Sequence, residues 1–197
     1  MARGIRKFIK ANDFHWKTLK KYWKHSSRSE LIVDLLFPLI VSIAFLFWSS
    51  IFINDFGVLI SKFRDLSGQV IAAISILAGF NITSITVISA AGSQSEEFKK
   101  RDNEEGQNLF DMLIVFFTWA VIIQLTVVML SIFLYYLGSL APSSLNLPVP
   151  YWGWACAVLW LSLTIHSIFI SLRNIKTLYL FVTYKPGNSS GIPPSGR

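Results

Sequence analysis

Residues 68–92 read GQVIAAISILAGFNITSITVISAAG, a run that contains no Lys, Arg, Asp or Glu. As a helix with a rise of about 1.5 Å per residue, about 20 apolar residues span the roughly 30 Å hydrocarbon layer of a bilayer. The small and hydroxylated residues of the run recur in steps of three and four, so they share one helical face. This small-residue stripe consists of Gly68, Ala72, Ser75, Gly79, Thr83, Thr86 and Ala90.

A small-residue face lets helix backbones approach closely, and helix association in lipid depends on that approach. The stripe therefore predicts a packing seam and places this helix at the centre of a bundle. The competing interpretation is the wall of a water-filled path between subunits. The opposite face is bulky and suits lipid or a neighbouring helix; it carries Ile71, Ile74, Ile85 and Ile88.

The composition of the chain is that of a membrane protein. Of its 197 residues, 53% are hydrophobic, and the mean hydropathy of +0.52 is too high for a soluble domain of this size. We expect an all-α integral membrane domain over residues 31–185. Its four transmembrane helices are predicted at 31–53, 68–92, 109–137 and 151–172, with an interfacial turn at 54–67.

The first 30 residues form a basic arm with nine of the eighteen Lys and Arg residues. Apolar and aromatic side chains fall close to one helical face, which predicts an amphipathic helix in the headgroup region, in contact with anionic lipid. Ordinary positive flanking charge is part of the same picture, and direct binding of nucleic acid is not expected. The lysines expected to contact lipid or a partner are Lys17, Lys20, Lys21 and Lys24.

A charged segment, residues 93–108, joins the second and third spans and contains five acids and three bases. We expect a polar hairpin that faces the basic arm or a soluble partner, although a solvated loop explains the same composition. Its candidate contact residues are Glu96, Glu97, Glu104 and Glu105. The last residues, 186–197, are rich in Gly, Pro and Ser and are predicted to be disordered.

Four polar side chains lie within the predicted spans: Asp34, Asn81, Gln124 and His166. An amide in hydrocarbon must find a partner, and Asn81 and Gln124 lie at similar depth if their helices are antiparallel neighbours, so we expect a hydrogen bond between them. Asp34 is expected to be a solvated charge within reach of Lys24 and Arg28.

His166 is expected to bond a neighbour or interfacial water. Asp34, Asp111, His166 and Arg173 all belong near the same membrane face, which makes a polar cluster geometrically possible.

The distribution of positive charge predicts the topology. Lys and Arg number nine before the first span, then two, three and none in the successive connections, and four from Arg173 onward. With both termini in the cytoplasm, sixteen of the eighteen face inward, as the positive-inside rule requires.

The sequence contains no motif for nucleotide binding, zinc hydrolysis or nucleophilic catalysis. Its single cysteine, Cys156, excludes an intrachain disulfide and a CxxC metal site. We therefore expect neither an enzyme nor a bound cofactor or metal. The four spans show no internal repeat of the kind that secondary transporters carry.

The layout of four spans, basic termini, a charged hairpin and the segment ISILAGFNITSITVIS resembles the membrane subunits of bacterial anti-phage defence systems of the Kiwa type. That resemblance implies a non-enzymatic sensor of the inner membrane that signals to a cytosolic partner, and it defines no functional residue. We expect an oligomeric sensor or scaffold; the alternative is an oligomeric ion channel or membrane-permeabilising effector.

Overall fold

A computed structural model describes residues 13–94, 108–142 and 147–183, and every named element within these ranges is a helix. A short helix α2 (Phe14–His25) is followed by α3 (Arg28–Leu31), the π-helical turn η1 (Ile32–Leu36) and α4 (Phe37–Ser50). The remaining helices are α5 (Phe56–Gln94), α7 (Leu109–Leu140) and α8 (Tyr151–Thr183).

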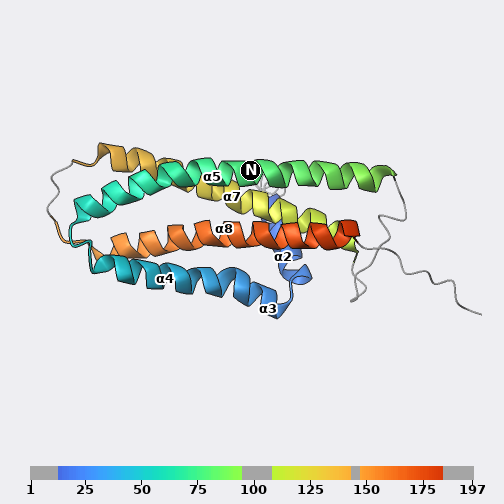
Figure 1. Cartoon of the computed structure of the whole chain (residues 1–197), viewed down its shortest axis with the longest axis horizontal. Helices are drawn as coiled ribbons and strands as arrows, with labels where there is room; N and C mark the ends of the chain where they lie inside the picture. The colour runs from blue at the N-terminus through green and yellow to red at the C-terminus, as the bar shows by residue number, and fades with distance from the viewer. Residues whose placement is uncertain (1–12, 95–107, 143–146, 184–197) are drawn as a thin grey trace, which may run out of the picture.

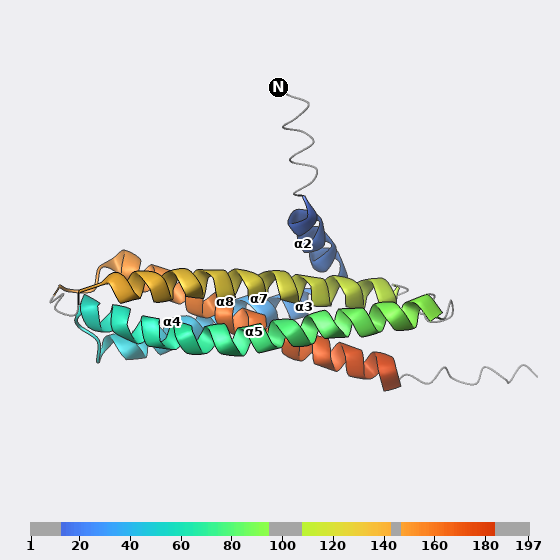
Figure 2. The ribbon, with the colours of Figure 1, turned by 90° about the horizontal axis from the view of Figure 1, so that it is seen from above.

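The four long segments lie side by side as an elongated bundle, and α2 projects from its side across the long axis (Figures 1 and 2). Four helices are long and apolar enough to cross a membrane: Ser29–Ser50, Phe56–Ala91, Phe110–Leu140 and Tyr151–Tyr179. The chain is therefore a multi-pass, all-helical membrane protein in its described part.

The helices extend beyond the predicted spans. α5 begins at Phe56, so most of the predicted turn at 54–67 is helical; Asp55 Oδ1 accepts the N–H of Gly57 at 2.6 Å at that start. With 39 residues α5 is about 58 Å long, well beyond the roughly 30 Å hydrocarbon layer. α8 likewise continues to Thr183 instead of ending at 172.

The core of the bundle forms where α5, α7 and α8 meet. Ile74 of α5, Val127 of α7 and Trp160 of α8 belong to one buried cluster. A second cluster, nearer the end of α5 and the start of α7, contains Ile88, Leu113 and Phe117. The Trp160 indole N–H donates to Ser131 Oγ at 3.0 Å, so the one polar atom of that side chain is satisfied inside the core.

Within the protomer, the small-residue stripe is not the packing seam. Its members from Ala72 to Ala90 are exposed, and a Cβ added to Gly79 would meet nothing within 4 Å. α5 packs through the opposite face, where Ile74 and Ile88 are buried. The close backbone approach occurs instead at Gly138 of α7, where an added Cβ would lie 2.9 Å from Arg64 Cβ.

Candidate functional site

Asp34 lies on the widened turn η1, four residues before Pro38. Proline has no N–H to donate to the carbonyl one turn earlier, which here is that of Asp34. His166 Nδ1 of α8 contacts that carbonyl oxygen. Because a carbonyl only accepts, Nδ1 carries the proton, and the histidine fills the gap that the proline leaves. The sequence-based expectation that His166 bonds a neighbour is thus met by a backbone atom.

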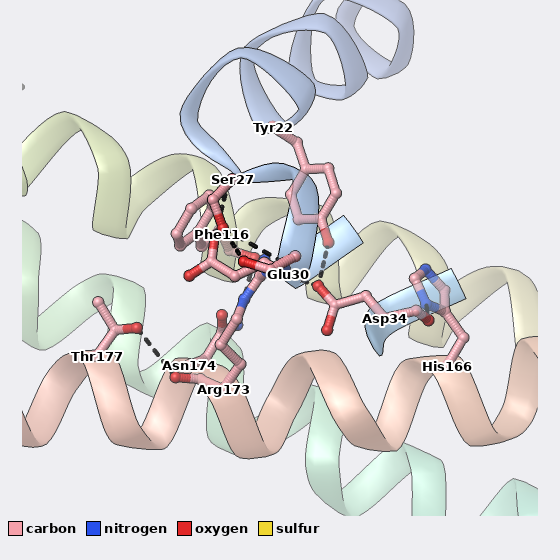
Figure 3. Close-up of polar contacts among 10 residues, drawn as sticks. Tyr22, Ser27, Glu30, Asp34, Phe116, His166, Arg173, Asn174 and Thr177 are labelled. Atoms are coloured by element: carbon pink, nitrogen blue, oxygen red, sulfur yellow. Dashed lines mark hydrogen bonds and ion pairs between the residues drawn. The ribbon is translucent and has the colours of Figure 1, made fainter. Parts of the chain in front are cut away.

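The Asp34 carboxylate forms a buried ion pair with Arg173 of α8 (Figure 3). The exposed fractions of the two side chains are 3% for Asp34 and 12% for Arg173. The expectation of a solvated Asp34 near Lys24 and Arg28 is therefore wrong. The guanidinium supplies the compensating charge that a carboxylate needs inside the bundle, and removing one partner of such a pair costs about 3–5 kcal/mol.

Tyr22 of α2 reaches into the bundle and completes this group. Its hydroxyl donates to Asp34 Oδ2 at 2.7 Å, and only 1% of the residue is exposed. The centre of its ring lies 5.7 Å from that of Phe116 and 5.5 Å from that of Trp119 on α7. Burial, supported by the bond to Asp34, raises the pKa of Tyr22 far above its usual value, although Arg173 opposes the shift. The phenol therefore keeps its proton and remains a donor.

The Arg173 guanidinium lies over the rings of both Tyr22 and Phe116, with Cζ at 5.0 and 4.5 Å from the two ring centres. Cation–π attraction at desolvated sites stabilises such arrangements by about 2 kcal/mol or more. We call Tyr22, Asp34, Phe116, His166 and Arg173 the Tyr22 clasp. It joins α2, the first span, α7 and α8 at one place.

The lysines predicted to contact lipid or a partner, Lys17, Lys20, Lys21 and Lys24, are all exposed on α2. Thr18 and Tyr22 are the buried residues of this helix and face the bundle. Trp16 and Trp23 are more than half exposed, as expected for aromatic side chains at a membrane interface. α2 thus has one side docked on the bundle and the rest of its surface open.

A second buried polar group lies between α5, α7 and α8. Asn81 Nδ2 donates to Gln124 Oε1 at 2.9 Å, so the hydrogen bond expected from the sequence is present. Ser171 Oγ accepts from Asn81 Nδ2 at 3.1 Å and from Gln124 Nε2 at 2.6 Å, and it donates to the Ser167 carbonyl at 3.0 Å. This group fixes the register of three spans, and Asn81 Oδ1 is its one buried atom without a hydrogen-bond partner.

Sequence reasoning did not include Tyr22, Phe116 or Ser171 in either group. Ser171 had a detectable signal, because Thr164, Ser167, Ser171 and Asn174 recur at helical spacing, and all four are buried. Asp111 does not join the clasp; it is exposed, and its N–H is bonded by Asn108 Oδ1 at 3.1 Å at the start of α7. Glu96, Glu97, Glu104, Glu105 and the tail 186–197 lie outside the described residues.

No group of three His, Cys, Asp or Glu side chains that could hold a metal ion occurs among the described residues. Comparison with protein-family models, curated proteins and solved structures gave no match.

Proposed function

We propose that the chain is a non-enzymatic, oligomeric sensor or scaffold of the bacterial inner membrane. In this proposal both termini are cytoplasmic, and the protein couples an event at the cell envelope to a cytosolic protein partner. The observation that carries the proposal is the Tyr22 clasp, which ties an arm helix outside the spans to charged groups inside them. The resemblance noted in the sequence adds anti-phage defence as the biological setting.

The clasp supports coupling because the docking of α2 on the bundle depends on the relative position of two spans. Asp34 belongs to the first span and Arg173 to α8, and Tyr22 contacts both side chains. A shift of one span relative to the other separates the partners of Tyr22 and weakens the docking of α2. A hydrogen bond to a charged group contributes about 1.5–3 kcal/mol, so its loss changes the docking equilibrium by roughly tenfold or more.

Charge supports the orientation. Nine basic residues precede the first span, three lie in the connection between α5 and α7, and four lie from Arg173 to the C-terminus, so sixteen of eighteen belong to the side to which we assign the cytoplasm. The lysines of α2 are exposed there for anionic lipid or a partner. The acidic residues of 93–108 follow α5 at the same side and supply the complementary charge of a docking surface.

Recovery of a partner from native membranes tests the proposal. Changing Glu96, Glu97, Glu104 and Glu105 to Gln removes the acidic charge without altering the spans, and it should abolish partner recovery and biological activity. Tyr22→Phe should alter the amount of partner recovered, because it removes only the hydroxyl that bonds Asp34.

Tyr136→Phe is the matched control, since Tyr136 is exposed on α7. Full recovery and full activity of the glutamine variant would contradict the docking role of the hairpin.

An oligomeric channel is the second candidate, and the exposed small-residue stripe of α5 favours it. Gly79, Thr83 and Thr86 lie on the outer surface of the protomer, where only another subunit could complete a path. Thr83 and Thr86 bond carbonyls of their own helix, at 2.9 and 3.1 Å. Voltage-driven current from the purified protein in a planar bilayer, abolished by Thr83→Leu, would favour this candidate over the sensor.

A further inference from the structure

Arg173 leaves one complete edge of its guanidinium without a partner. Nη1 is used by Asp34, whereas Nε and Nη2 are buried and have no hydrogen-bond partner. These two N–H groups project side by side from the same edge and form the fork that binds two oxygens of one carboxylate or phosphate. A buried guanidinium with an open fork is costly unless another acceptor reaches it.

Two further buried polar groups lie next to Tyr22, whose ring contacts the Arg173 guanidinium. The Trp119 indole N–H and Ser26 Oγ are also buried without partners, and each is adjacent to Tyr22, through ring contact or one helical turn. Glu30, the other acid drawn in Figure 3, accepts the Ser27 N–H at 2.9 Å and is not a partner of Arg173. Lys24 and Lys176 are exposed on the adjoining helices.

We infer that the Nε and Nη2 edge of Arg173 is a receptor for a phosphate group, carried either by an anionic phospholipid of the adjacent leaflet or by a free phosphate ion. The planar fork matches two phosphate oxygens, and the neighbouring basic side chains raise the local concentration of anions. Both nitrogens are covered in the docked arrangement, so phosphate enters when Tyr22 and α2 move aside.

In this inference, phosphate binding and the docked position of α2 exclude each other, because Nε and Nη2 are buried while Tyr22 lies against the guanidinium. The inference deepens the proposed coupling function, because it names the ligand that would hold the released state of the arm. It is tested on the purified chain without a protein partner, so its failure can be told apart from failure of the partner proposal.

The experiment measures phosphatidylglycerol retained by the full-length protein in detergent, by native mass spectrometry. Arg173→Lys keeps the charge opposite Asp34 but has no fork, and it should retain the lipid roughly tenfold more weakly than the wild type. Lys62→Gln is the control, because it removes an exposed positive charge near the start of α5, away from Arg173. It should retain the lipid nearly as well as the wild type.

Asp34→Asn supplies a variant whose predicted effect is a gain. The substitution removes the negative charge that competes with phosphate for Arg173, and it weakens the hydrogen bond that the Tyr22 hydroxyl donates at this position. Lipid retention should therefore increase. Added inorganic phosphate separates the two sources: displacement of the lipid by millimolar phosphate assigns the site to the free ion, and persistence of the lipid assigns it to the headgroup. Equal retention by wild type and Arg173→Lys, or a loss in Asp34→Asn, would overturn the inference.

Discussion

The hydroxyl of Tyr22 donates a 2.7 Å hydrogen bond to Asp34 Oδ2, although the tyrosine belongs to a helix outside the spans and the aspartate to the first span. Both side chains are almost completely buried. The bond therefore connects a helix outside the spans to a charge inside the bundle, and the docking of α2 should follow changes made at Asp34 and its partners.

Asp34 and Arg173 should be strongly coupled in their effects on the free energy of unfolding. Arg173→Met leaves the Asp34 carboxylate buried without its cation, so we expect a loss of about 3–5 kcal/mol in the free energy of unfolding. The double variant Asp34→Leu with Arg173→Met removes both charges and should recover most of that loss. Equilibrium unfolding in mixed micelles measures both; additive losses in the double variant would argue against the pair.

The buried amide group should hold the three spans in register. Asn81→Leu leaves Gln124 without one partner, and coupling energies between polar side chains in membranes are about 0.6–2 kcal/mol. We therefore expect a double-mutant cycle of Asn81→Leu and Gln124→Leu to show coupling of that size. Thr126 is exposed and bonds only the Ile122 carbonyl of its own helix, so Thr126→Val is a control that should show no coupling to Asn81→Leu.

Glycine substitutions should distinguish the inner and outer faces of the α5 and α7 pair. Gly138→Ala places a methyl group 2.9 Å from Arg64 Cβ, so it should destabilise the protomer by about 1–3 kcal/mol. Gly79→Leu faces open space and should leave protomer stability nearly unchanged. If the stripe contacts a second subunit, Gly79→Leu should instead lower the fraction of oligomer seen by size exclusion.

The contribution of Tyr22 to the docking of α2 should depend on pH only in the alkaline range. The folded pKa of Tyr22 lies above its ordinary value of about 10, so its contribution is complete below the unfolded value and declines as the pH rises through the folded value. Protection of α2 should therefore be constant from pH 7 to 9 and fall at higher pH. The Tyr22→Phe protein should lack this fall in α2 protection at high pH. An identical fall in both proteins would assign the pH dependence to another group.

Cysteine labelling of intact cells tests the orientation on a Cys156→Ser background. Leu147→Cys, in the loop at the far end of the bundle from α2, should react with a membrane-impermeant reagent (Figure 1). Ser27→Cys, next to α2, should react only after the membrane is opened. The reverse pattern would contradict the positive-inside assignment.

The sequence predicted the spans because unbroken apolar runs of this length have few alternatives to a membrane helix. The pairing of Asn81 with Gln124 was predictable for a related reason, since an amide in an apolar interior needs a partner at its own depth. The stripe of α5 misled because helical periodicity identifies a face but not its partner, and Val70, Ile74, Asn81 and Ile88 form another face with the same periodicity.

The sequence placed Asp34, His166 and Arg173 near one membrane face, but the contacts that join them to one another and to Tyr22 and Phe116 were not predictable from local patterns. The ion pair joins residues 139 positions apart, and the geometry of the clasp depends on a π-helical turn and on the carbonyl that Pro38 leaves without a donor. Nothing in the sequence distinguishes Tyr22 from the neighbouring aromatic residue Trp23, which is exposed. The hydroxyl reaches Asp34 only because α2 packs against α7 in the folded chain, a long-range contact that the sequence does not reveal (Figure 3).

Hydrogen–deuterium exchange of the α2 amides, residues 14–25, tests most directly whether the hydroxyl of Tyr22 holds the arm on the bundle. The measurement compares wild type, Tyr22→Phe and the control Tyr136→Phe in the same lipid nanodiscs. Loss of one hydrogen bond to a charged acceptor should speed exchange in α2 by roughly tenfold or more, with α5 and α7 unchanged and the control like wild type. Equal exchange of α2 in wild type and Tyr22→Phe would contradict the account.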